Sequence, residues 1–139
     1  MQIYGGGCTE ARAVVDVRKS AATEQDVSAY VTRIHVITET KMYREASRAW
    51  ADSLLALPSV LAENAGASAA VATHELVAHH NLGHHSYGIA PDGTVSDMRT
   101  LNVREGLAVR LSMLSLATET ACQIIRIDEV IVHQREEEI

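Results

Sequence analysis

Five of the seven histidines of this 139-residue chain fall in one stretch, HELVAHHNLGHH, at residues 74–85. A histidine followed by glutamate on a helix is typical of zinc proteases, whose two metal-binding histidines stand four residues apart, roughly 40° around the helix axis. Four residues after His74 this sequence has Ala78. The following histidines lie roughly 140° and 120° around a helix from His74. The spacing therefore argues against a protease zinc site and against Glu75 as its catalytic base.

A looser metal site from His80, His84 and His85, on the two sides of Gly83, stays open as an alternative. Adjacent histidines at the polar end of a helix are more often solvated side chains, so ligand spacing favours that simpler interpretation. A metal-binding protein or a metal-dependent hydrolase built on this cluster would carry zinc in stoichiometric amount.

The two cysteines, Cys8 and Cys122, lie far apart and lack the CxxC spacing of metal or redox sites. Neither stands in a local motif that marks an activated thiol, and a Ser–His–acid triad cannot be read from scattered residues. We therefore predict two semi-buried, reduced thiols, as in cytosolic proteins.

The composition predicts one helical domain. The chain is long enough for a single hydrophobic core, and 47% of its residues are apolar. Phenylalanine is absent and Trp50 is the only tryptophan, so the core must be aliphatic, which suits packed helices. No internal repeat or low-complexity linker suggests a second domain.

The charge balance argues against two classes of partner. The formal net charge is −6, and residues 133–139 form an acidic tail. Because no basic patch can neutralise phosphates, we expect no nucleic acid and no membrane as a partner. No apolar run approaches the roughly 18 residues of a membrane span, and the start of the sequence lacks the features of a signal peptide. We expect a soluble, cytoplasmic chain.

Helical periodicity covers most of the sequence. We predict a helix over 9–20 that opens from three glycines, and a second from Thr23, although the alternation in 31–38 leaves a strand open there. From Met42 a single buried stripe is expected at helical spacing. Its further members are Ala46, Trp50, Leu54, Leu57 and Leu61. Pro58 interrupts that stripe, so we expect a kink there, or a new short helix with Pro58 in its first turn and Gly66 just past its end.

The second half of the chain mixes helices with short strands. Residues 68–82 predict a helix closed by Gly83, and 88–95 predict two strands around a Pro-Asp-Gly turn. Asn102 is expected to have a positive φ. A long amphipathic helix from Glu105 follows, and the β-branched residues 124–132 predict a terminal strand. The apolar stripe of this helix consists of Leu107, Leu111, Leu114, Thr118 and Ala121.

Gly5, Gly6 and Gly7 before a helix are the remaining chemical feature. Glycine lets backbone N–H groups approach a polar or anionic ligand at a helix N-terminus. Three glycines are more often a flexible segment or a point of tight packing, and neither GxxxxGK[ST] nor GxGxxG is present. Both interpretations stay open on the residues alone.

Several segments, in order along nearly the whole chain, resemble the C-terminal half of the equatorial domain of group II chaperonins, the cytosolic t-complex (TRiC/CCT) family. The matching segments are YGGGCTE at 4–10, ALPSVLAENAG at 56–66, the helix end and glycines at 76–88, GTVSDM at 93–98 and LATETACQIIRIDEVI at 116–131. Within the family the first segment is most like the beta subunit. Residues 20–42 match poorly and suggest an insertion.

Three departures from the family pattern concern the same region of the chain. Ala90 stands where the family usually has aspartate, and Asn102 replaces a usual glycine. The hairpin over 88–95 is also about one residue short. Asparagine tolerates the left-handed backbone that glycine adopts, so the second departure is compatible with the family fold.

The resemblance implies a mainly α, multi-helical fold with a small β-hairpin and a C-terminal β-strand, with residues 1–139 as the C-terminal part of an equatorial domain. It implies ATP as cofactor, with one wall of the nucleotide pocket in this chain. Gly5, Gly6 and Gly7 would approach the nucleotide through their backbone, Gly88 and Ile89 would line the adenine side, and Thr100 with Asn102 would lie near the ribose.

The resemblance also implies what this chain lacks. The family's GDGTT phosphate loop, its magnesium-binding aspartate and its water-positioning aspartate are absent, so magnesium would be held by residues outside this chain. Phosphoryl transfer needs metal and positioned water, so we expect no ATP hydrolysis by this chain alone.

The implied partners are other chaperonin subunits in a double ring and unfolded substrate proteins. A terminal strand without its neighbour would be an exposed apolar edge, so self-association or marginal stability is expected. A helical protein-interaction module without nucleotide remains the main alternative.

Overall fold

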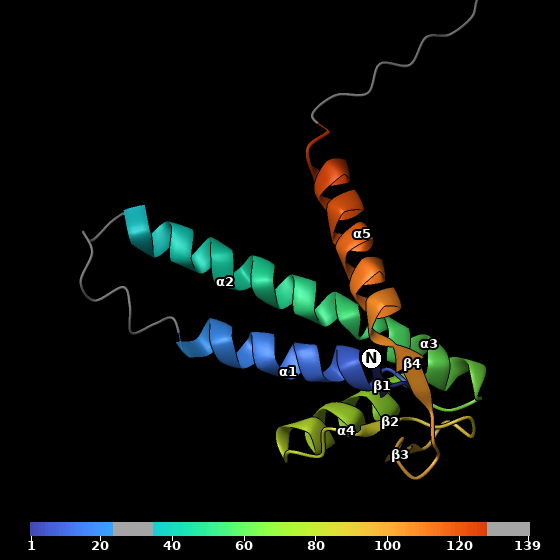
Figure 1. Cartoon of the computed structure of the whole chain (residues 1–139). Helices are drawn as coiled ribbons and strands as arrows, with labels where there is room; N and C mark the ends of the chain where they lie inside the picture. Colours follow the sequence, from blue (N-terminus) through green and yellow to red (C-terminus); the bar gives the residue numbers. More distant parts are fainter. Residues whose placement is uncertain (24–34, 128–139) are drawn as a thin grey trace, which may run out of the picture. The chain divides into compact units, whose positions relative to one another are not determined.

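A computed structural model describes residues 1–23 and 35–127 and divides the chain into two compact units (Figure 1). The larger unit is Gln2–Glu105, and the smaller unit consists of Met1 and Gly106–Ile139. Several predicted segments lie outside the described residues: the helix predicted from Thr23 as far as residue 34, residues 24–34 of the predicted insertion at 20–42, residues 128–132 of the predicted strand, and the acidic tail at 133–139.

The larger unit is mainly helical, as predicted, with two small sheets at one end of its helices. Its helices are α1 (Cys8–Thr23), α2 (His35–Leu54), α3 (Ala56–Asn64) and α4 (Ala69–Asn81). Its strands are β1 (Gln2–Tyr4), β2 (Tyr87–Ile89), β3 (Val95–Asp97) and β4 (Arg104–Gly106), the last of which ends at the boundary with the smaller unit. Strand β1 pairs with β4, and β2 pairs with β3.

Helices α1 and α2 lie side by side (Figure 1). The guanidinium of Arg18 on α1 forms an ion pair with the carboxylate of Asp52 on α2, with an N–O distance of 2.6 Å. Both partners are exposed, so this pair contributes little to stability. Val14 on α1 and Ala51 on α2 are fully buried, and such small aliphatic side chains let helices approach closely.

The core of the larger unit joins α1, α3, α4 and β2, and it is aliphatic, as the composition predicted. Its central cluster of buried side chains consists of Ala11, Ala62, Ala72, Leu76 and Ile89. Burying Leu76 and Ile89 contributes about 2 kcal/mol each by transfer from water, whereas the three alanines mainly allow close contact. The cluster therefore fixes α4 and the start of the hairpin against α1.

Helices α3 and α4 end in the same hydrogen-bond pattern. Gly66 has φ 78°, its N–H donates to Glu63, and the N–H of Ala67 donates to Ala62. Gly83 has φ 91°, with equivalent bonds to two histidine carbonyls of α4. This is the Schellman motif, in which a left-handed glycine satisfies the last helical carbonyls. The predicted short helix with Pro58 in its first turn and the predicted closure at Gly83 are both confirmed.

The hairpin is also confirmed. Strands β2 and β3 are antiparallel, with Gly88 opposite Ser96, and Gly93 in the turn has φ 81°. The carboxylate of Asp92 accepts hydrogen bonds from the hydroxyl and the N–H of Thr94, and these bonds lower the pKa of Asp92. Beyond the hairpin, Asn102 has φ 54°, so the predicted positive φ is confirmed.

Two predictions about apolar positions are corrected. The stripe from Met42 to Leu61 is not a buried stripe, because Met42 is 67% exposed and Leu61 is 37% exposed, while Ala51 is the buried residue among positions 41–54 of α2. Helix α2 presents a different face to α1 than the periodicity indicated. The terminal strand is wrong at its start, because Ile124 and Ile125 are the last residues of α5 (Leu107–Ile125). A helix satisfies its backbone locally, and this outweighs the weak strand preference of β-branched residues.

The smaller unit is built on the amphipathic helix α5, which the sequence predicted. None of its residues is buried, and Val109 and Ile125 are 72% and 80% exposed. The N–H of Leu107 donates to the carbonyl of Met1, which places that residue in this unit. No helix in the described part of the chain combines the length and apolarity needed to cross a bilayer.

Two glycines with similar φ angles give a matched test of this fold. A Cβ at Gly66 would meet open space, whereas a Cβ at Gly93 would lie 2.6 Å from the Cβ of Ala67. Gly66→Ala should therefore cost only the left-handed strain of about 1 kcal/mol. Gly93→Ala should cost about 1 to 3 kcal/mol more, because a backbone must also shift. Urea unfolding measures both, and equal losses would contradict this account of the hairpin tip.

Candidate functional site

The candidate site begins at the tight turn formed by Gly5, Gly6 and Gly7 between β1 and α1. All three residues are buried, and Gly6 and Gly7 have φ angles of 68° and 74°. Residues with a side chain rarely adopt such angles, so the turn requires glycine at both positions. The carbonyl of Gly7 accepts the N–H of Ala11 at 3.0 Å and thereby starts α1.

The hairpin lies directly against this glycine turn. The N–H of Ile89 donates to the carbonyl of Gly6 at 2.7 Å. A Cβ built on Gly88 would lie 2.8 Å from the carbonyl oxygen of Gly5 and 2.9 Å from that of Gly6. Five residues that the sequence predicted as site residues, Gly5, Gly6, Gly7, Gly88 and Ile89, are therefore brought together from distant parts of the chain.

The loop after the hairpin also contacts the glycine turn. The carbonyl of Val103 accepts the N–H of Gly5 at 3.1 Å, and the N–H of Val103 donates to the carbonyl of Met98. Thr100 and Asn102 stand on this loop with exposed side chains, and the Thr100 hydroxyl donates to the carbonyl of Asp97 at 2.7 Å. These two predicted site residues are thus connected to the glycine turn only through the backbone of the loop.

Sequence reasoning missed the residues that fill the space beside the glycines. A Cβ on Gly6 would lie 2.8 Å from the sulfur of Met98, and a Cβ on Gly7 would lie 2.8 Å from the Cβ of Pro58. At Gly5 the nearest atom would be a carboxylate oxygen of Glu105, also at 2.8 Å. Protein atoms therefore exclude side chains here, as the tight-packing interpretation expects. In the sequence, only the apolar residue Met98, directly after β3, indicated that a side chain from this segment packs against the glycines.

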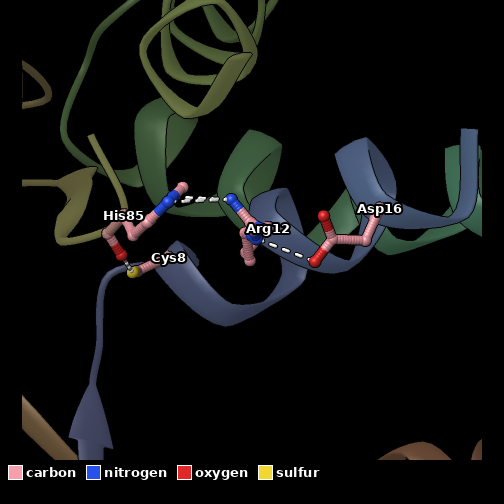
Figure 2. Close-up of polar contacts among 4 residues, drawn as sticks. All are labelled: Cys8, Arg12, Asp16 and His85. Atoms are coloured by element: carbon pink, nitrogen blue, oxygen red, sulfur yellow. Dashed lines mark hydrogen bonds and ion pairs between the residues drawn. The ribbon is translucent and has the colours of Figure 1, made fainter. Parts of the chain in front are cut away.

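Buried polar groups surround the start of α1. Cys8 is 4% exposed, and its thiol donates to the carbonyl of His85 at 2.9 Å (Figure 2). Burial, helped by the nearby carboxylates of Glu10, Asp97 and Glu105, raises the pKa of the Cys8 thiol to about 11. The thiol is therefore protonated at neutral pH and is no nucleophile. Cys122 is exposed on α5, so the prediction of two semi-buried thiols is wrong.

Asp97 itself is ionised near this cluster. A hydrogen bond from Ser86, another from the N–H of Arg99 and the positive charge of Arg99 lower the pKa of Asp97. A lowered pKa favours the carboxylate form, so Asp97 remains negative throughout the neutral range. Its charge is one reason why the thiol nearby resists ionisation.

The histidines predicted as a looser metal site point to separate partners. His80 is fully buried and donates from Nε2 to the carbonyl of Tyr87 at 2.9 Å, and burial lowers its pKa. The ring of His85 accepts from Arg12, while His84 contacts His79 with 2.9 Å between their Nδ1 atoms. Among residues 1–23 and 35–127, no three side chains of His, Cys, Asp or Glu are grouped so that they could hold a metal ion.

The two thiols should differ strongly in reactivity. A pKa of about 11 for Cys8 gives roughly 100-fold less thiolate than an ordinary cysteine, and burial blocks access in addition. At pH 7.5 a disulfide reagent should modify one thiol rapidly and the second only after denaturation. Cys122→Ser should remove the rapid phase, whereas Cys8→Ser should leave it unchanged. Equal rates for both thiols in the folded chain would contradict the buried Cys8.

A model of the TCP-1/cpn60 chaperonin family matches residues 2–135 of the chain. The T-complex protein 1 subunit delta of Ochlerotatus triseriatus is 34% identical over 94% of this chain and 22% of its own length. The gamma subunit of Tetrahymena pyriformis is 34% identical over 79% of this chain and 20% of its own length. The beta subunit of Bos taurus is 30% identical over 93% of this chain and 22% of its own length.

Solved structures agree with the sequence comparisons. The open-state monomer of a group II chaperonin from Methanococcoides burtonii matches with a TM-score of 0.74 and 26% identity. The match covers 91% of this chain and 28% of that monomer. The chain thus spans about a fifth of the length of the curated relatives it matches.

Proposed function

This chain belongs to the TCP-1/cpn60 chaperonin family, and from that premise we propose that residues 1–139 are the C-terminal part of an equatorial domain. In this proposal the chain works as one segment of an ATP-dependent chaperonin subunit that assists protein folding. The proposal is supported by the length of the match, which runs from residue 2 to residue 135, and by the mainly helical fold.

The observation that carries the proposal is the contact between the glycine turn and the hairpin. The bond from the Ile89 N–H to the Gly6 carbonyl joins two segments that resemblance assigns to one wall of a nucleotide pocket. In the proposed wall, the buried glycines and Gly88 set the backbone shape. Gly88 and Ile89 would line the adenine side through their backbone, because the Ile89 side chain is buried in the core.

Two exposed polar side chains complete the proposed wall. Thr100 and Asn102 stand on the loop that Val103 connects to Gly5, and both are open to solvent. A hydroxyl and an amide are suitable partners for the ribose hydroxyls. Because the φ of Asn102 is 54°, substitution by glycine removes its amide without straining the loop.

The proposed cofactor is ATP, and the phosphates with their magnesium ion would be handled by residues that this chain does not contain. The described residues include no cluster of three or more His, Cys, Asp or Glu side chains that could hold a metal ion. We therefore propose that this chain contributes binding and orientation of the nucleoside but does not hydrolyse ATP by itself.

The proposed partners are the remainder of a chaperonin subunit, neighbouring subunits of a double ring and, through the assembly, unfolded proteins. The exposed apolar face of α5 supports the first of these, because such a face is normally covered in a folded domain. Its most exposed large apolar members are Val109, Leu111, Leu116, Ile124 and Ile125. We propose a cytoplasmic location for the assembly, by analogy with the family.

The subunit type is a finer part of the proposal. The YGGGCTE segment is most like the beta subunit, and we propose a beta-type origin for the glycine turn. The overall identities are 34% to a delta subunit, 34% to a gamma subunit and 30% to a beta subunit, so they support the family without separating its subunit types.

The same exposed face of α5 favours one competing function, a helical interaction module without nucleotide. The two functions differ in what happens at the glycine turn and the loop. An interaction module needs neither the backbone of Gly88 and Ile89 nor the side chain of Asn102 to respond to a purine. The nucleotide wall proposed for this chain uses both, although the family usually has glycine in place of Asn102.

Nucleotide titration of the ¹⁵N-labelled chain tests the proposal. Adding ATP without magnesium should shift the backbone amides of Ile89, Thr100 and Asn102, with weak, roughly millimolar affinity because the phosphates find no partners. Asn102→Gly should retain the fold and weaken binding severalfold, because one ribose hydrogen bond is lost.

The matched control for this titration is Thr120→Ala on α5, in the smaller unit, whose hydroxyl donates to the carbonyl of Leu116 within the helix. It should leave binding unchanged. Saturating ATP without amide shifts at the three positions would contradict the nucleotide wall and leave the interaction module as the better description.

A further inference from the structure

The loop that carries Thr100 and Asn102 takes its shape from Asp97, the last residue of β3. The Asp97 carboxylate accepts the N–H of Arg99 at 2.9 Å. The Asp97 carbonyl accepts the N–H of Thr100 at 3.1 Å and the N–H of Leu101 at 3.3 Å. An aspartate that accepts hydrogen bonds from the residues shortly after it closes a turn. Asp97 therefore sets the backbone that carries Thr100.

Ser86, one residue before β2, fixes the Asp97 carboxylate. Ser86 is 4% exposed, and its hydroxyl donates to that carboxylate. The Ser86 carbonyl also accepts the N–H of Met98 at 2.9 Å, and Met98 is fully buried beside Gly6. Because a buried donor from another segment holds the carboxylate, the turn has a defined position next to the glycine turn.

Both ends of the loop are attached to the segment that forms the glycine turn. At the first end, the Arg99 guanidinium lies 5.8 Å from the centroid of the Tyr4 ring, and Tyr4 directly precedes Gly5. At the other end, the N–H of Gly5 donates to the Val103 carbonyl at 3.1 Å. Between these contacts the N–H of Asn102 donates to the Arg99 carbonyl at 3.3 Å. The backbone that carries Asn102 is therefore held from both sides.

The hydroxyl proton of Thr100 is already used within the turn. The hydroxyl donates to the Asp97 carbonyl at 2.7 Å. A hydroxyl has one hydrogen to donate and two lone pairs, so the exposed Thr100 oxygen can only accept from a ligand while this bond persists. A ribose hydroxyl can donate such a bond, whereas a deoxygenated sugar carbon cannot. The turn therefore favours a ligand whose sugar hydroxyl donates to Thr100.

We propose that Asp97 is a positioning residue for ribose recognition in the nucleotide wall, an inference that rests on the proposed function. Asp97 directs the Thr100 hydroxyl so that its oxygen accepts a hydrogen bond from a ribose hydroxyl, and it holds the turn in which Asn102 meets the same sugar. The Asp97 carboxylate itself is engaged by the Ser86 hydroxyl and the Arg99 N–H, so Asp97 acts through the loop. The ligand class is a ribonucleoside phosphate with free 2′ and 3′ hydroxyls.

Comparison of ATP with 2′,3′-dideoxy-ATP, which lacks both ribose hydroxyls, tests the inference. Each nucleotide is titrated without magnesium into the ¹⁵N-labelled chain, and the Ile89 amide reports binding at a position away from the sugar contacts. The unsubstituted chain should bind ATP about fivefold more tightly than the dideoxy analogue, because one net hydrogen bond is worth about that factor. In Asp97→Ala this preference should disappear while the affinity for the dideoxy analogue stays unchanged, because only the sugar contacts depend on the turn.

Three further variants refine the comparison. Asp97→Asn should keep the preference for ATP, because its amide oxygen can accept the Arg99 N–H. Asp92→Ala is the matched control, because the Asp92 carboxylate accepts the N–H of Thr94 at 3.0 Å in the same manner but in the turn of the hairpin. It should also keep the preference. Ser86→Ala leaves Asp97 without its buried donor and should reduce the preference, so it tests the inference even if Asp97→Ala does not fold.

Failure of the Asp97 role and failure of the proposed function give different results. A preference for ATP that persists in Asp97→Ala and Ser86→Ala, or an equal loss of affinity for both nucleotides, would overturn the role of Asp97 alone. Equal affinity of the unsubstituted chain for both nucleotides would overturn ribose recognition by the loop. Amides of Ile89 and Thr100 that respond to neither nucleotide would overturn the proposed function itself, and this inference with it.

Discussion

The hydrogen bond from the Ile89 N–H to the Gly6 carbonyl, 2.7 Å long, holds together the part of the molecule on which the rest depends. It joins the turn that starts α1 to the strand that follows α4, so a backbone contact fixes these two segments in addition to the side chains of the core. Such an approach tolerates no side chain at Gly6 or Gly88, since a Cβ on either residue would fall within 3 Å of backbone atoms. The glycines are therefore required by geometry before any ligand is considered.

The close packing at the glycine turn also involves residues from other segments. Met98 and Pro58 occupy the space that side chains at the glycines would need, and Val103 continues the contact to the loop with Asn102. The turn after α4 lies against the same start of α1, through the contacts of His85 with Cys8 and Arg12. One close backbone contact thus supports the proposed nucleotide wall.

Sequence reasoning anticipated the parts of this arrangement that depend on local chemistry. Gly66, Gly83 and Gly93 mark their turns because only left-handed backbone closes them, and Asn102 could be placed in that conformation for the same reason. What could not be foreseen depends on neighbours. Periodicity does not show which face of α2 meets α1, and a β-branched ending does not show whether Ile124 finds a partner strand or continues a helix. The contacts of Pro58 and Met98 with the glycines likewise arise only when distant segments meet.

Hydrogen exchange at the Ile89 amide tests the central contact most directly. If the bond to Gly6 holds the hairpin to the start of α1, this amide should exchange as slowly as the core amides of Ala72 and Leu76 in α4, because all of them open together. Exchange at Ile89 as fast as at the exposed loop residue Thr100, while α4 stays protected, would show that the hairpin is not fixed to the glycine turn and would contradict the account.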